Sequence, residues 1–250
     1  MDPRTRSSYT AFVNRSFRDV ADRDYLAARV LYRLNLGSQF LWSAHQAVEK
    51  YLKAILLYND VSTKRLGHDL WKAYQKLYQI RDIPFGFPAD VEEFIKYLDW
   101  QGNNRYFEKP AFTTGNELLM LDRTVWHIRR YCFWMHGYTT PGPDGKRLYM
   151  FPEYIEAIKD FPVGQASKYR MFLGYLERVL DEKSLGHREY LVWKNFYYGS
   201  YKKRSIRNFK AHSWSANPAH YLEPGLFEVL RRRVKFSRDV EDLFSRGSKE

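Results

Sequence analysis

One segment of the sequence has side chains suited to both the bases and the phosphates of a single-stranded nucleic acid. Residues 194–210 hold six lysines and arginines, five aromatic rings and no acidic residue. Rings stack on unpaired bases, and lysine and arginine neutralise phosphates. The alternative is a solvated basic loop whose rings pack on a helical core. The binding interpretation names these contact residues: Tyr201, Lys202, Lys203, Arg204 and Arg207.

A second group of polar residues shares one face of a long helix. His45, Glu49 and Lys53 follow one another at intervals of four, so they lie on one side of a helix. Glu49 is placed to pair with Lys53 one turn further on. A short polar linker then leads to His68 in the tetrapeptide Gly-His-Asp-Leu, which ends at Leu70.

The elements that must position these residues are helices. Apolar residues recur every three or four positions between 38 and 59, which predicts a long buried helix there. Asp22 has the character of an N-cap for a preceding helix that ends before Gly37. Three more helices are expected in the first half, from about Gly67 to Pro84, from Pro88 to Gly102 and from Asn116 to Met135, with a loop at 103–115.

The expected organisation is an arm or short helix at residues 1–21, a helical bundle at 22–138 and a mainly helical, basic region at 146–250 that could pack on the bundle. Residues 139–145 are rich in proline and glycine and predict a turn and linker. The fold class is therefore all-α. Helices of the second half are expected at 152–159, 168–181, 188–196 and 226–244.

The string Ala44–Ala54, followed by Gly-His-Asp-Leu, resembles the HEPN family of nucleotide-binding helical domains. The resemblance covers roughly residues 22–136 and includes the pair Arg105-Tyr106. It implies an antiparallel helical bundle, a nucleotide ligand, a homodimer and, for members with the Gly-His-Asp-Leu pattern, a nucleotidyltransferase-type partner. Candidate ligand-binding residues in these segments are His45, Glu49, Lys53, His68 and Arg105.

Many HEPN ribonucleases pair an arginine with a histidine a few residues later and cut RNA without metal. By this resemblance Arg129 and His136 are candidate catalytic residues. Imidazole can transfer a proton near neutral pH, and guanidinium can neutralise a phosphate. The usual polar residue just after the arginine, commonly Asn, is absent, since Arg130 stands there. The alternative is that Arg129 pairs with Asp122 and that His136 interacts with a helix C-terminus.

Composition limits the remaining possibilities. A net charge of +12 and a pI near 9.6 favour anionic partners such as nucleic acid. The single cysteine, Cys132, excludes an intrachain disulfide, and the scattered histidines lack zinc-ligand spacing, so neither a metal nor another cofactor is expected. The chain starts without a secretion signal and has no apolar run of the roughly 20 residues that span a bilayer, so a cytoplasmic protein without a membrane partner is expected.

Three functions are consistent with these patterns. The first is a HEPN-like protein that binds nucleotide or single-stranded RNA. The second is a metal-independent endoribonuclease of the toxin or defence type that uses Arg129 and His136. The third is a non-catalytic helical interaction subunit, which could dimerise through the apolar seam that runs from Leu118 to Met135.

Overall fold

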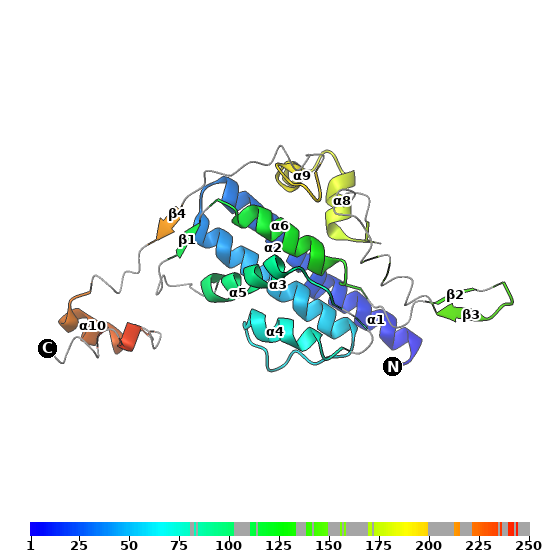
Figure 1. The fold of residues 1–250 in the computed structure, drawn as a ribbon, viewed down its shortest axis with the longest axis horizontal. Helices are drawn as coiled ribbons and strands as arrows, with labels where there is room; N and C mark the ends of the chain where they lie inside the picture. The colour runs from blue at the N-terminus through cyan, green and yellow to red at the C-terminus, as the bar shows by residue number, and fades with distance from the viewer. Residues whose placement is uncertain are drawn as a thin grey trace.

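The computed structural model describes residues 1–80, 83, 85–102, 111–113, 115–133, 139–141, 143–149, 156, 158, 170–171, 173–199, 213–215, 222–234, 236, 240–242 and 244. Helices make up most of this part of the chain (Figure 1). The strands described there are each three residues long. The all-α prediction is therefore confirmed.

The N-terminal segment is helical and docked on the bundle. Helix α1 (Pro3–Val13) begins at Asp2, whose carboxylate accepts hydrogen bonds from the backbone of Arg4 and Thr5. It runs through a five-residue π-helix, η1 (Asn14–Arg18), into α2 (Asp19–Arg33). The Tyr9 hydroxyl donates to the Leu57 carbonyl, and Arg6 pairs with Asp60. Both contacts hold this segment against residues 57–60.

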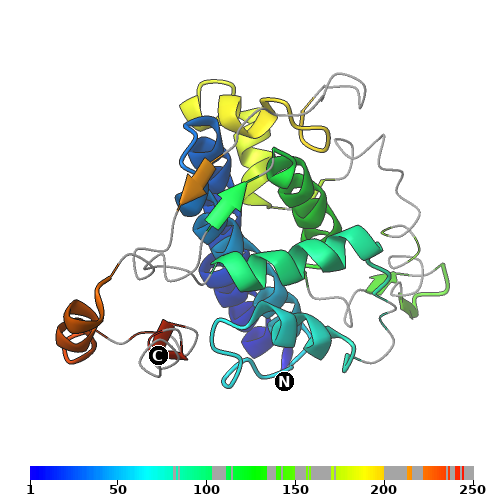
Figure 2. The ribbon, with the colours of Figure 1, turned by 60° about the vertical axis from the view of Figure 1, so that its left-hand side comes forward.

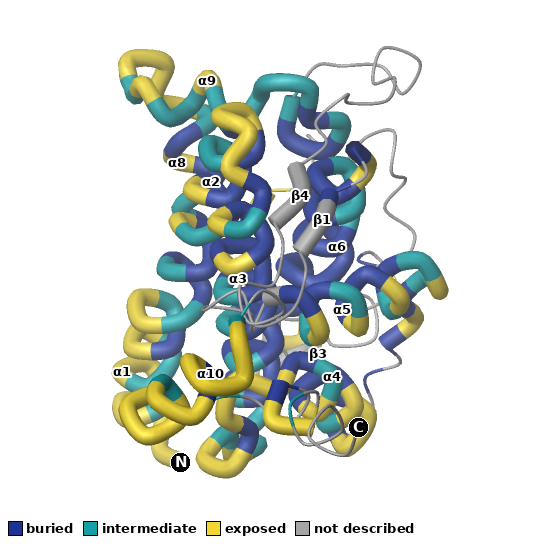
Figure 3. The backbone as a smooth tube through the Cα atoms, turned by 90° about the vertical axis from the view of Figure 1, so that its left-hand side faces the viewer, coloured by how far each residue is buried: buried dark blue, intermediate teal, exposed yellow. Residues whose placement is uncertain are grey.

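Helix α3 (Gly37–Tyr58) is the centre of the bundle, and Figure 3 shows it enclosed by its neighbours. Its predicted boundaries of 38–59 are confirmed to within one residue. Helix α2 packs along it, and α4 (Leu70–Leu77), α5 (Ala89–Gly102) and α6 (Glu117–Arg129) cover its other sides. The core residues shared by α3 and α6 are fully buried: Val48, Leu52, Ile55, Leu121, Val125 and Ile128.

Two helices are shorter than the sequence predicts. Helix α4 begins at Leu70, not near Gly67, because Asp69 caps it by accepting a hydrogen bond from the Lys72 backbone. Helix α6 ends at Arg129, so the predicted extension to Met135 is wrong for the described residues 130–133. There the chain turns, and the ring of Tyr131 packs between Phe85 and Phe87.

The apolar seam of α6 is not available as an interface. Leu118, Leu121, Val125, Ile128 and Cys132 have no exposed surface in the single chain. Helices α3 and α5 cover this face. The idea that a homodimer forms through this seam is therefore wrong for the described residues up to 133, because the seam belongs to the intrachain core.

Part of the second half packs back on the bundle. Helices α8 (Tyr175–Asp181) and α9 (Gly186–Val192) lie against α2, and both are shorter than the predicted helices at 168–181 and 188–196. Strand β4 (Ser213–Ser215) pairs antiparallel with β1 (Ala111–Thr113), beside α3 (Figure 2). Segments that lie about a hundred residues apart in sequence are thus joined.

Other parts of the second half lie away from this core. The predicted linker at 139–145 instead begins an antiparallel hairpin of β2 (Thr139–Pro141) and β3 (Arg147–Tyr149). Helix α10 (Pro224–Arg231) lies beyond the bundle in Figures 1 and 2. It forms its own small apolar cluster, in which Phe227 stacks on Phe244 and Val240 is buried. The predicted helix at 152–159 falls outside the described residues except for 156 and 158.

Candidate functional site

The structure brings together four of the predicted ligand-binding residues, around the carboxylate of Glu49. Lys53 Nζ donates to Glu49 Oε1 at 2.5 Å, and His68 Nδ1 lies 3.0 Å from Glu49 Oε2. His45 lies on the same face, with Nδ1 3.9 Å from that oxygen. His45 has no exposed surface, whereas the His68 side chain is 57% exposed. Of the four residues, His68 is therefore the one best placed to meet a ligand.

This cluster fixes the loop between α3 and α4. Lys53 also donates to the carbonyl of Gly67 at 2.6 Å, and Gly67 has a φ of 56°, which glycine adopts without strain. Burial alone would raise the pKa of Glu49, but the hydrogen bonds from Lys53 and His68 outweigh it and lower that pKa. Glu49 is therefore a charged anchor that holds the loop in one conformation.

The outward side of this loop forms a basic hollow of about 300 Å³ with the first turns of α4. Lys76 Nζ donates to the Ser62 carbonyl at 2.7 Å, and Lys72 Nζ lies 3.4 Å from the Arg65 carbonyl. Because each ammonium carries three donors, these bonds leave N–H groups for other acceptors. The lining consists of Arg65, Leu66, Lys72, Gln75, Lys76 and Gln79, and so includes no carboxylate among the described residues.

Arg129, the predicted catalytic arginine, lies within a buried ion-pair network. Its side chain is 2% exposed and bonds to Asp22 at 2.8 and 2.9 Å and to Glu177 at 2.7 and 2.8 Å. Burial alone would raise the pKa of Glu177, but the charge of Arg129 outweighs it and lowers that pKa. The geometry favours a structural role for Arg129.

The sequence named the wrong partner for Arg129. Asp122, the expected partner, pairs with Arg29 instead and accepts a hydrogen bond from the Tyr25 hydroxyl at 2.6 Å. Arg29 also donates to the carbonyls of Tyr190 and Trp193. This second buried ion pair ties α2 and α6 to the segment around α9.

The remaining predicted site residues fall outside the described part of the chain. They are His136, Arg105, Tyr201, Lys202, Lys203, Arg204 and Arg207. At the start of the basic and aromatic segment, Tyr197 and Tyr198 are buried, and Tyr197 stacks on Trp126 with ring centroids 5.8 Å apart. For these two rings the alternative of packing on the helical core is confirmed.

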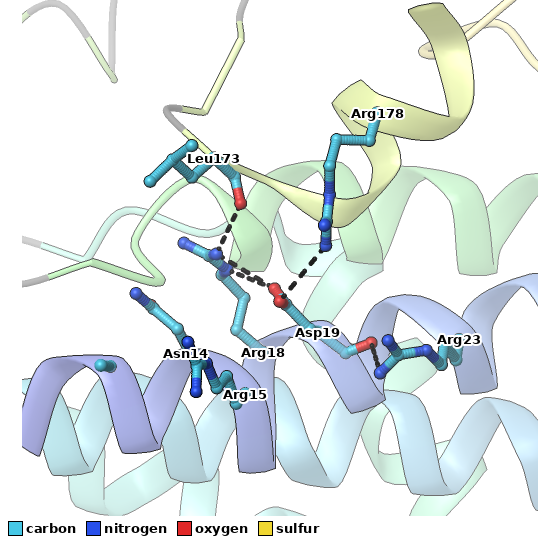
Figure 4. Close-up of a pocket in the computed structure, with 8 residues that line it drawn as sticks. Asn14, Arg15, Arg18, Asp19, Arg23, Leu173 and Arg178 are labelled. Carbon is cyan, nitrogen blue, oxygen red and sulfur yellow. Dashed lines mark hydrogen bonds and ion pairs between the residues drawn. The ribbon is translucent and has the colours of Figure 1, made fainter. Parts of the chain in front are cut away.

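A cavity of about 390 Å³, walled by arginines, lies where η1 and the start of α2 meet the segment before and within α8 (Figure 4). Its lining residues are Ala11, Asn14, Arg15, Arg18, Asp19, Arg23, Leu173 and Arg178. Sequence reasoning missed this site. The arginines of residues 1–23 were a visible signal, but nothing local indicates that Leu173 and Arg178 complete the wall.

The described residues include neither a group of side chains suited to hold a metal ion nor a helix suited to span a membrane. No group of three or more histidine, cysteine, aspartate or glutamate side chains is placed there to hold a metal ion. Among the helices of the same residues, none has the length and apolar character that a membrane crossing requires.

Comparison with known proteins gives one positive result. A family model of the HEPN domain matches residues 15–109, which include η1, α2, α3, α4 and α5. No curated protein and no solved structure matches the chain. The matched region contains the Glu49 cluster and its loop, and it begins at Arg15 of the arginine-walled cavity. Residues 15–109 therefore match the HEPN family, which confirms the resemblance over this part of the chain.

Proposed function

We propose that this HEPN-domain protein binds single-stranded RNA or nucleotide through phosphate groups, at the basic hollow lined by Arg65, Lys72 and Lys76. The observation that carries this proposal is the lining of that hollow, where Arg65, Lys72 and Lys76 gather without a carboxylate among the described residues. Phosphate contacts from lysine and arginine supply most of the sequence-independent affinity for nucleic acid. A net charge of +12 adds long-range attraction.

The loop geometry supports this proposal because the binding groups are held before any ligand arrives. Glu49, Lys53 and Gly67 fix the loop from inside, so Arg65 and His68 face solvent from a stable backbone. Preorganised groups lose less conformational entropy when they bind. The predicted ligand-binding cluster therefore acts mainly as a support, with His68 at its solvent-facing edge.

The test is RNA binding measured by fluorescence anisotropy over a range of salt concentrations. In the variant Arg65→Gln/Lys72→Gln, affinity should fall and the salt slope should flatten by about 0.7 for each lost phosphate contact. The matched control Arg4→Gln/Lys183→Gln also removes one exposed arginine and one exposed lysine, both outside the hollow. Equal effects of the two double variants would reject this site.

We favour binding over RNA cleavage because the guanidinium of Arg129 is already bonded to two buried carboxylates. A group that neutralises a scissile phosphate must reach it, and Arg129 is 2% exposed. Incubation with mixed RNA in the presence of a chelator tests this preference. Cleavage by the wild type that disappears in His136→Ala would establish the ribonuclease alternative of the toxin or defence type.

The homodimer, the nucleotidyltransferase-type partner and the role as a non-catalytic interaction subunit stay predictions of the resemblance. A homodimer would need a surface other than the α6 seam, which the chain itself covers at its described residues. Sedimentation at tens of micromolar protein would separate a dimer from a monomer.

A further inference from the structure

The π-helix η1 forms part of one wall of the arginine-walled cavity. In η1 the hydrogen bonds close over five residues, as the bond from the Asp19 backbone N–H to the Asn14 carbonyl shows. Residues four and five apart therefore lie on nearly the same side, which places Asn14 with Arg18 and Asp19 in one wall, and Arg15 one turn before Asp19. Short π-helical segments are rare and frequently occur at functional sites. Arg23 extends this wall one turn into α2.

The opposite wall comes from a distant part of the chain. The Leu173 carbonyl accepts a hydrogen bond from Arg18 at 3.1 Å, and Arg178 reaches down from α8 to within 3.8 Å of Asp19 (Figure 4). Helix α8 is held in this place by the buried pair of Glu177 with Arg129. The rigid ion-pair network thus positions one side of the cavity.

The cavity has more positive charge than its own carboxylate neutralises. Arg18 and Asp19 form a buried pair at 3.0 Å. Arg15, Arg23 and Arg178 are exposed, and the described residues of the lining include no second acidic side chain. The Arg15 guanidinium has no hydrogen bond or ion pair within the part of the chain described here.

Two of these cations are held in place by an aromatic ring. The guanidinium carbons of Arg23 and Arg178 lie 4.5 and 5.5 Å from the centroid of the Tyr175 ring. Such cation–π contacts orient a planar guanidinium without neutralising it. Arg23 also donates one N–H to the Asp19 carbonyl at 3.4 Å, and its other N–H groups, like those of Arg178, keep their capacity to bind an anion.

We propose that this cavity binds a terminal phosphate group, carried by a free nucleotide or by the 5′ end of an RNA. A terminal phosphate carries more negative charge than a backbone diester, which suits three surplus arginines, and its oxygens accept paired N–H bonds from guanidinium forks. The volume of about 390 Å³ lies within the range of small-ligand sites. This inference rests on the proposed function, which includes both RNA and nucleotide as ligands.

The test uses calorimetric titration of the full chain with pyrophosphate, with a nucleoside triphosphate, and with one oligoribonucleotide in 5′-phosphate and 5′-hydroxyl forms. The variant Arg15→Gln/Arg178→Gln should weaken binding of each terminal phosphate about tenfold or more, because it removes charge-assisted hydrogen bonds. The control Arg4→Gln/Arg232→Gln removes two exposed arginines outside the cavity. Arg15→Lys keeps the charge but loses the fork, and should retain only part of the affinity.

The outcomes separate the ligand sources and the two proposals. Selective weakening of the 5′-phosphate RNA assigns an RNA end, and selective weakening of pyrophosphate and triphosphate assigns a nucleotide. If the cavity variant binds every ligand as the control does, while both melt like the wild type, the cavity proposal is wrong. The 5′-hydroxyl RNA has no terminal phosphate, so its binding tests only the hollow lined by Arg65, Lys72 and Lys76. Loss of this binding in Arg65→Gln/Lys72→Gln supports the proposed function whether or not the cavity binds a terminal phosphate.

Discussion

Arg29 and Arg129 differ from the cavity arginines in the number of carboxylates and carbonyls within their reach. Arg129 has two carboxylates, from Asp22 and Glu177, while Arg29 has Asp122 and two backbone carbonyls. Among the described residues that line the cavity, Asp19 supplies the one carboxylate, which Arg18 binds at 3.0 Å and Arg178 approaches to 3.8 Å. The same residue type is therefore a structural tie in one place and, in the proposed anion site, is left with unused hydrogen-bond donors in the other.

Burial explains why the two regions differ. A guanidinium removed from water is tolerated only when hydrogen bonds and opposite charge replace its hydration. Arg29 and Arg129 meet this condition through segments on both sides of the fold. Arg15 and Arg178 keep their water, so they need no full set of partners and can exchange that water for a ligand.

The largest effect that would test this comparison is expected from Arg129→Ala. It would leave Asp22 and Glu177 buried without their cation, which should destabilise the fold by about 3–5 kcal/mol. Urea unfolding monitored by circular dichroism measures this loss. A change below 1 kcal/mol would mean that Arg129 is not the structural tie described here and would reopen its catalytic role.

Acidification should weaken the buried region through protonation of His127 in the unfolded chain. Burial, together with the charge of Arg130, lowers the pKa of His127 from 6.5 to about 4. The unfolded chain therefore binds a proton between pH 6.5 and 4 that the folded chain does not. The contribution of neutral His127 to the free energy of unfolding is complete above pH 6.5. Between pH 6.5 and 4 it falls by up to about 1.4 kcal/mol per pH unit. Chemical denaturation of wild type and His127→Gln checks this, since the variant should show a flatter pH profile over that window.

An intermediate loss of stability is expected when the partly buried Glu49 loses its charge. Glu49→Gln keeps the shape of the side chain but loses its charge-assisted bonds to Lys53 and His68, which should destabilise the protein by about 1–3 kcal/mol. Thermal unfolding measures the change. The loop model also expects faster amide hydrogen exchange at residues 62–69, and unchanged exchange there would contradict the anchoring role of Glu49.

The smallest effect is expected at the cavity. Arg15→Gln/Arg178→Gln should change the free energy of unfolding by no more than about 0.5 kcal/mol, because both side chains are exposed and like-charged. The same urea experiment applies. A loss as large as that of Arg129→Ala would place these arginines among the structural ties and remove the contrast.

Much of the bundle could be predicted from sequence because its information is local. The spacing of apolar residues from 38 to 59 fixes α3, and the interval of four fixes the pair Glu49–Lys53. The Gly-His-Asp-Leu string marks the loop before α4, although the helix begins at Leu70 and not near Gly67. These features depend on helical periodicity and on neighbouring residues, which the sequence displays directly.

Helix ends and charge partners were less predictable. The pattern from Leu118 to Met135 continues past the true end of α6, since the turn at 130–133 is stabilised by the packing of Tyr131 on Phe85 and Phe87. Helical spacing also favoured Asp122 as the partner of Arg129. Arg129 pairs instead with Asp22, more than a hundred residues away in sequence, because α2 lies beside α6 in the bundle.

What the sequence by itself determined is the helical class, the HEPN resemblance and the polar face of α3. Only the tertiary structure decided which arginines are structural and which are available to bind. That division depends on Glu177, Leu173 and Arg178, which fold back on residues of the N-terminal helices. Contacts between segments so far apart in the chain leave no periodic trace, because they are fixed by how the helices pack and not by the order of residues within any one helix.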